Sequence, residues 1–236
     1  MILFKRFMVC ALCVAVTLTS VYFFKSAEQI SVMSENSDIR PTIIIDAGHG
    51  GFDGGALAED GTLEKDLNLK IAKRLKHLLL QGGFYVIMIR NDDVSVEDDP
   101  EQSIAKRKVS DMKRRLETIK SHPNAIFVSI HLNKYTTASP RGAQVFYSVN
   151  VQNSSVLADK IQSSFKALLQ PENNRSTKAA GKEIFLLYNA TIPAVIVESG
   201  FLSNCDELSL LKNEEYQTKS AIAIYCGILE YFMHQE

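Results

Sequence analysis

The sequence predicts an α/β domain with a single open, mostly parallel twisted sheet and helices on both faces, preceded by an N-terminal membrane or export helix. Three short apolar runs suit strands that are buried on both faces, because they are rich in β-branched residues. These runs are residues 43–45, 125–130 and 194–197. Segments with apolar residues at helical spacing lie between them, and such alternation is typical of parallel sheets.

The first segment of the chain carries an export pattern. Lys5 and Arg6 precede an apolar run from Phe7 to Phe24, and flanking basic residues keep the N-terminus in the cytoplasm while the rest is exported. The run has about 18 residues, near the lower limit for a membrane span and longer than most signal cores. Residues 1–25 are therefore either a signal peptide or a membrane anchor, and a buried core helix is disfavoured by the position and the charges.

The remaining boundaries follow from composition and periodicity. Polar residues 26–39 predict a linker, and residues 40–236 a globular domain outside the cytoplasm. Thr62 is the expected N-cap of a helix from Leu63 to Gln81, which Gly82-Gly83 ends. The other expected elements are strands 84–89, 142–149 and 184–188, helices 104–120, 153–169 and 204–236 with a break near Asn213, and loops 91–101 and 171–181.

The charge and the cysteine content of the chain indicate which partners and covalent links are expected. The formal net charge is −1, so electrostatics gives no reason to expect nucleic acid. The basic face of helix 104–120 either meets an acidic polymer or is solvated. For Cys205 and Cys226 a disulfide is left open, and buried free thiols are the simpler interpretation.

Residues able to bind a metal or move a proton follow each apolar run. His49 follows the first within a glycine-rich loop, His131 the second and Glu198 the third, at the strand ends where α/β sheets place their sites. Glu64, in the first turn of a helix, adds a fourth. Two histidines and one carboxylate suit zinc with an open position for water. Glu198 could then carry the proton from water to a leaving amine, or it only ties down the following turn.

Supporting residues and rival classes complete the sequence hypotheses. Asp46 either orients a zinc-bound histidine or caps the turn, and Asn68 and Asn133 are candidates for hydrogen bonds that hold the loops. A dinucleotide site is disfavoured because Asp53 stands where its fingerprint requires glycine. A serine hydrolase is disfavoured because Ser199 lacks the Gly-x-Ser-x-Gly elbow.

Four motifs occur in one order: IIIDAGHGG, then EKDLN from Glu64, then SIHLN around His131, then AVIVESGFLSN around Glu198. Together they resemble the zinc-dependent N-acetylmuramoyl-L-alanine amidases that cleave peptidoglycan, over residues 40–236. The resemblance implies that His49, Glu64 and His131 bind Zn²⁺ and that Glu198 is the catalytic glutamate. It also implies hydrolysis of the amide between N-acetylmuramic acid and the L-alanine of the stem peptide.

Within that family, the length, the apolar N-terminus and the SIHLN form are most like the germination-specific amidases of spore-forming bacteria. This implies a role in spore cortex maturation, and it leaves the need for an activating protein partner open. The chain departs from the pattern at residues 104–120, which are longer and more charged than a plain connecting helix. The rival hypothesis is a catalytically silent wall-binding or regulatory module of the same fold, against which the presence of all four site residues argues.

Overall fold

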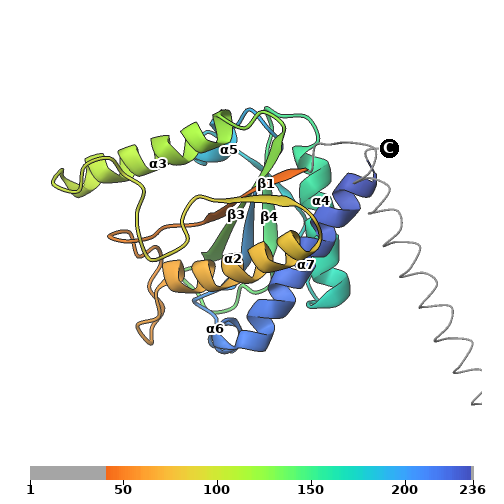
Figure 1. Cartoon of the computed structure of the whole chain (residues 1–236). Helices are drawn as coiled ribbons and strands as arrows, with labels where there is room; N and C mark the ends of the chain where they lie inside the picture. Colours follow the sequence, from red (N-terminus) through yellow and green to blue (C-terminus); the bar gives the residue numbers. More distant parts are fainter. Residues whose placement is uncertain (1–40, 235–236) are drawn as a thin grey trace, which may run out of the picture. The chain divides into compact units, whose positions relative to one another are not determined.

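The computed structural model describes residues 41–234, which build one sheet with helices on its two faces (Figure 1). The strand order is β2-β1-β3-β6-β4-β5. Strands β2, β1, β3 and β6 run parallel, β4 runs antiparallel to β6, and β5 is parallel to β4. The mostly parallel sheet that the sequence predicts is confirmed. The strand bounds are β1 Thr42–Ala47, β2 Tyr85–Met88, β3 Ala125–Asn133, β4 Gln144–Ser148, β5 Lys178–Ala180 and β6 Ala194–Phe201.

Helices cover both faces because neighbouring strand residues point in opposite directions. Ile43 and Ile45 pack in a core cluster with apolar residues of α2, α4 and α7. Ile44 packs on the other face with Leu116 of α3 and Leu187 of α5, and Figure 1 shows these two helices together on that side. The helix bounds are α2 Glu64–Gln81, α3 Ile104–Lys120, α4 Ser154–Leu168, α5 Phe185–Asn189, α6 Cys205–Lys212 and α7 Glu214–Met233.

Three local predictions are wrong. The expected strand 184–188 is the short helix α5, because a five-residue apolar run fits either structure and its buried Leu186 and Leu187 are adjacent instead of alternating. The expected loop 171–181 contains β5, the edge strand of the sheet, which pairs with β4. Thr62 does not cap α2: Leu63 holds the N-cap position without a side-chain bond, while the amide of Thr62 donates to Asp60 in the preceding turn.

The predicted leader of residues 1–25 and linker of residues 26–39 lie outside the described residues. Within residues 41–234, no helix has both the length and the apolar character that a membrane crossing requires. Cys205 and Cys226 are free thiols, so a disulfide between them is excluded. The expectation that they are buried is wrong, because Cys205 is exposed and Cys226 is partly exposed.

Candidate active site

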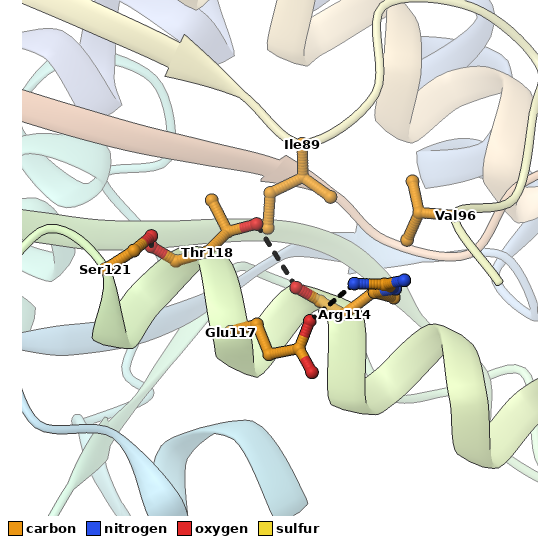
Figure 2. A pocket seen from close by; sticks show the side chains of 6 residues that line it. All are labelled: Ile89, Val96, Arg114, Glu117, Thr118 and Ser121. Atoms are coloured by element: carbon orange, nitrogen blue, oxygen red, sulfur yellow. Dashed lines mark hydrogen bonds and ion pairs between the residues drawn. The ribbon is translucent and has the colours of Figure 1, made fainter. Parts of the chain in front are cut away.

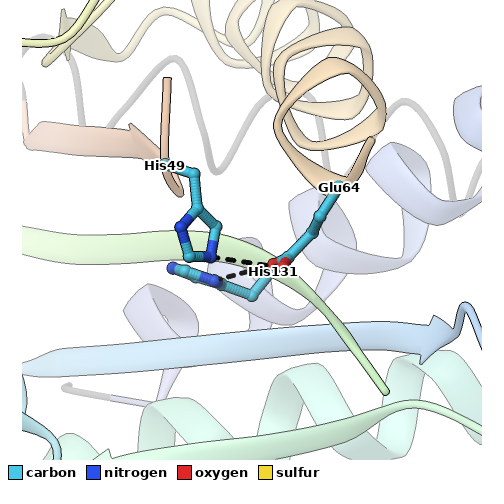
Figure 3. Close-up of side chains that lie close together, drawn as sticks. All are labelled: His49, Glu64 and His131. Atoms are coloured by element: carbon cyan, nitrogen blue, oxygen red, sulfur yellow. Dashed lines mark hydrogen bonds and ion pairs between the residues drawn. The ribbon is translucent and has the colours of Figure 1, made fainter. Parts of the chain in front are cut away.

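Three side chains predicted as metal ligands meet at the carboxyl end of β1 and β3 (Figure 3). The Nε2 atom of His49 lies 3.2 Å from Oε2 of Glu64, and Nδ1 of His131 lies 3.0 Å from Oε1 of Glu64. One donor atom from each residue lies within 4.8 Å of the other two. Two imidazole nitrogens and a carboxylate are a donor set of catalytic zinc sites, so these residues fit that metal.

Glycines give the three ligands room to converge. A Cβ atom on Gly48 would lie 2.2 Å from the His131 ring, and one on Gly55 would lie 2.6 Å from Oε2 of Glu64. Any side chain at either position would therefore displace a ligand. His49 itself has a φ of 63°, a left-handed conformation that is uncommon outside glycine and indicates that its surroundings hold it.

The carboxylate of Glu64 is aimed by several donors. As the first residue of α2, it accepts the amides of Ala56 at 2.8 Å and Leu132 at 3.1 Å. The side-chain amide of Asn68 donates to Glu64 at 3.2 Å and to the carbonyl of Gly48 at 3.3 Å, which confirms the predicted loop-holding role of Asn68. Burial alone would raise the pKa of Glu64, but the neighbouring His131 and His49 hold it well below its ordinary value.

Asp53, which the sequence hypothesis did not include, orients His49. Its Oδ2 atom lies 2.8 Å from Nδ1 of His49, the nitrogen that faces away from Glu64. Burial would lower the pKa of His49, but hydrogen bonds with Asp53 and Glu64 raise it to about 9. A carboxylate on the second ring nitrogen fixes the tautomer and the orientation of a metal-binding histidine. The sequence feature that could have indicated this role is the separation of four residues between His49 and Asp53 within one glycine-rich loop.

Asp46 does not have either of its predicted roles. It is 1% exposed, it forms an ion pair with Arg115 of α3, and it accepts the hydroxyl of Ser129 at 2.7 Å. Burial would raise the pKa of Asp46, but Arg115 and Ser129 hold it below its ordinary value. The carboxylate therefore anchors a buried arginine instead of a histidine or a turn.

Two buried arginines from different parts of the chain donate hydrogen bonds to the backbone of the His49 loop. Arg115 donates to the carbonyl of His49 at 2.9 Å while it pairs with Asp46. Arg90, which follows β2, donates to the carbonyl of Gly48 at 3.0 Å. These bonds satisfy carbonyls of the loop, and they explain how a left-handed histidine is held.

Glu198 lies next to the ligand group on the neighbouring strand. The β3–β6 register places it opposite His131, and its Oε2 atom is buried without a hydrogen-bond partner. Burial and the negative charge of Glu64 raise the pKa of Glu198 to about 7, against the opposing influence of His131. A carboxyl with that pKa can accept and return a proton near neutral pH.

A cavity of about 400 Å³ opens in front of the two histidines. Its wall combines the ligand loop with the apolar side of α5, and its lining includes His49, His131, Phe52, Ile184 and Phe185. A polar group can thus reach the ligand group while an apolar face rests on the aromatic side chains.

A separate hollow of about 380 Å³ lies between α3 and the segment after β2 that carries Ile89 and Val96 (Figure 2). Arg114 there pairs with Glu117 and Asp98, and Arg107 pairs with Glu97. The acidic residues that precede and line α3 therefore neutralise much of its basic face, which favours the solvated interpretation over an acidic-polymer surface.

Comparison with known proteins agrees with this geometry. A family model described as N-acetylmuramoyl-L-alanine amidase matches residues 43–230. The chain is 36% identical over 190 residues to the germination-specific N-acetylmuramoyl-L-alanine amidase of Bacillus subtilis, covering 80% of this chain and 79% of that protein.

Solved structures share the fold. The CwlD amidase from Clostridioides difficile, solved in complex with the GerS lipoprotein, matches with a TM-score of 0.79 and 42% identity over 82% of this chain and 99% of that one. An N-acetylmuramoyl-L-alanine amidase from Clostridium difficile 630 matches with a TM-score of 0.72 and 29% identity, over 84% of this chain and 99% of that chain.

Proposed function

The chain belongs to the N-acetylmuramoyl-L-alanine amidase family, and we propose that it cleaves the amide between N-acetylmuramic acid and L-alanine in peptidoglycan with one zinc ion. His49, Glu64 and His131 are the residues that would hold the metal. Zinc in such a site supplies a Lewis acid for the amide carbonyl and lowers the pKa of a bound water. The observation that carries the proposal is a partnerless buried carboxyl, Glu198, directly beside a three-donor ligand group.

The side chains of the site then have separate roles in proton transfer, orientation of His49 and positioning of the substrate. Glu198 accepts the proton of the attacking water and delivers it to the nitrogen of the departing L-alanine. Asp53 keeps His49 in one orientation throughout, through its bond to Nδ1. The cavity wall formed with Phe52 and Phe185 positions the substrate over the ligand group and limits access of bulk water.

The test separates chemistry from metal binding at Glu198. Glu198→Gln keeps the shape of the side chain but carries no proton, so kcat should fall about 10²–10⁴-fold while zinc content stays at one per chain. Zinc content, thermal midpoint and turnover on purified peptidoglycan are measured on one preparation. Glu101→Gln, an exposed change in the loop before α3, is the matched control.

The alternative, a silent module of the same fold, predicts a different result. A silent module shows no turnover even in wild type. If Glu198 instead only holds the following residues Ser199-Gly200 in place, the variant melts at a lower temperature and keeps near-normal turnover. Full zinc together with unchanged turnover in Glu198→Gln would refute the proposed mechanism.

We further propose that the enzyme acts outside the cytoplasm on spore cortex peptidoglycan, exported or anchored through residues 1–25. Similarity to the germination-specific amidase of B. subtilis supports this role. The CwlD structure was solved in complex with a lipoprotein, which supports a protein partner for this chain. Protease added to intact protoplasts should degrade an anchored form, or the protein should be found released. Complete protection of cell-associated protein would contradict the orientation.

A further inference from the structure

A second cavity, of about 550 Å³, lies at the β4 side of the sheet. Its lining combines two arginines with polar side chains, among them Arg141, Arg175, Gln170, Asn173, Glu207 and Tyr216. Gln144 of β4 lies opposite Glu198 in the β4–β6 register. Arg175 donates a hydrogen bond to the side-chain oxygen of this same Gln144.

Arg175 is held in place but incompletely paired. Its guanidinium lies 5.0 Å from the ring centroid of Phe201, and its backbone amide donates to Asn173 at 2.9 Å. The Nε atom is buried and has no hydrogen-bond partner, and no carboxylate in residues 41–234 forms an ion pair with this side chain. Arg175 is partly exposed and lines this cavity, so its charged head can meet an acceptor that enters the cavity.

The acidic residues of this cavity do not supply that acceptor. Glu207 accepts the amides of Gly142 and Phe201, each at 2.8 Å, so its two oxygens already hold the backbone. Glu172 and Asp206 are exposed residues of the lining. A guanidinium that no carboxylate neutralises suits an incoming carboxylate ligand.

We propose that Arg175 binds a free carboxylate of the stem peptide, which makes this cavity a subsite for the leaving-group side of the substrate. The inference rests on the proposed role of Glu198. Across the sheet, His131 lies on one side of Glu198 and Gln144 on the other. Since Glu198 protonates the departing amine, the peptide that bears this amine extends away from the ligand group toward β4. Neighbouring strands are about 5 Å apart, and Arg175 bonds Gln144 on the strand next to Glu198. Arg175 is therefore within reach of the residues that follow L-alanine.

The experiment uses two N-acetylmuramoyl dipeptides that differ only at the residue after L-alanine, which carries a free α-carboxylate or the corresponding carboxamide. Wild type should have the lower KM for the acid. Arg175→Gln should raise the KM for the acid about 10- to 100-fold, with little change in the KM for the amide. Arg175→Lys restores only part of the discrimination. Lys178→Gln, an exposed basic residue outside the cavity lining, is the control.

The outcomes separate this proposal from the proposed function. Equal losses on both probes, or no loss on either, would overturn the subsite, and zinc content and thermal midpoint identify a folding defect. If wild type with full zinc cleaves neither probe, the proposed function fails, and calorimetry on Glu198→Gln still tests the subsite. There the acid should bind more tightly than the amide, and the difference should vanish when Arg175→Gln is added. Equal binding of both probes to Glu198→Gln overturns it.

Discussion

Replacing the buried Arg115 should destabilise the protein more than almost any other change of a charged residue. Arg115 is 1% exposed, and its loss leaves the buried carboxylate of Asp46 with only the hydroxyl of Ser129. Removing one partner of a buried ion pair costs about 3–5 kcal/mol. In a domain of this size, each kcal/mol shifts the thermal midpoint by about 2–4 °C. Arg115→Met should therefore lower the midpoint by about 6–20 °C.

The adjacent arginine is a matched control for this measurement. Arg114 is half-exposed and pairs with Asp98 and Glu117 at the surface, so Arg114→Gln should leave the thermal midpoint close to that of wild type. Arg115→Lys should not rescue the loss, because an ammonium cannot bond Asp46 and the carbonyl of His49 in the same fork. Scanning calorimetry on zinc-free protein excludes stabilisation by metal. Equal midpoints for Arg115→Met and Arg114→Gln would refute the assigned role of Arg115.

Three further predictions concern the ligand group. His131→Ala should release zinc. His122→Ala should retain it, because the ring of His122 bonds only at the end of α3. Stoichiometric zinc in His131→Ala, measured by metal analysis, would exclude His131 as a ligand. Asp53→Asn should weaken zinc binding about 10–100-fold in a competition titration, and unchanged affinity would show that the Asp53 bond does not matter. Because the pKa of His49 is raised from 6.5 to about 9, zinc must displace a proton below pH 9, so affinity should increase as the pH rises from 6.5 to 9. The same shift stabilises the zinc-free protein below pH 6.5, and this contribution is lost as the pH rises through 9; opposite slopes would contradict the assignment.

The ligand group could be predicted because each member marks the end of an element. His49 lies two residues after β1, His131 and Glu198 lie in the carboxyl-terminal halves of β3 and β6, and parallel strands bring their carboxyl ends together. Glu64 is the first residue of a helix whose apolar stripe the sequence displays. Apolar residues that repeat every two positions in strands and every 3.6 in helices are thus enough to place these four residues, although not their exact bonds.

The supporting arginines could not be predicted in this way. Arg114 and Arg115 are neighbours in one basic stretch, yet one faces solvent and the other pairs with Asp46, 69 residues earlier in the chain. Only the packing of α3 on the sheet decides which of them is buried. Likewise, the residues of α5 satisfy strand and helix patterns equally over so short a length, and their burial between α3 and the sheet selects the helix.

The strand order separates metal binding from proton transfer along the sequence. The three ligands lie between residues 49 and 131, whereas Glu198 lies on β6, the last strand of the sequence, which is placed between β3 and β4. β4 thus pairs with β6 on one side and with β5 on the other. The proton carrier lies beside the ligand group because the last strand occupies the middle of the sheet, so the complete site requires the complete sheet.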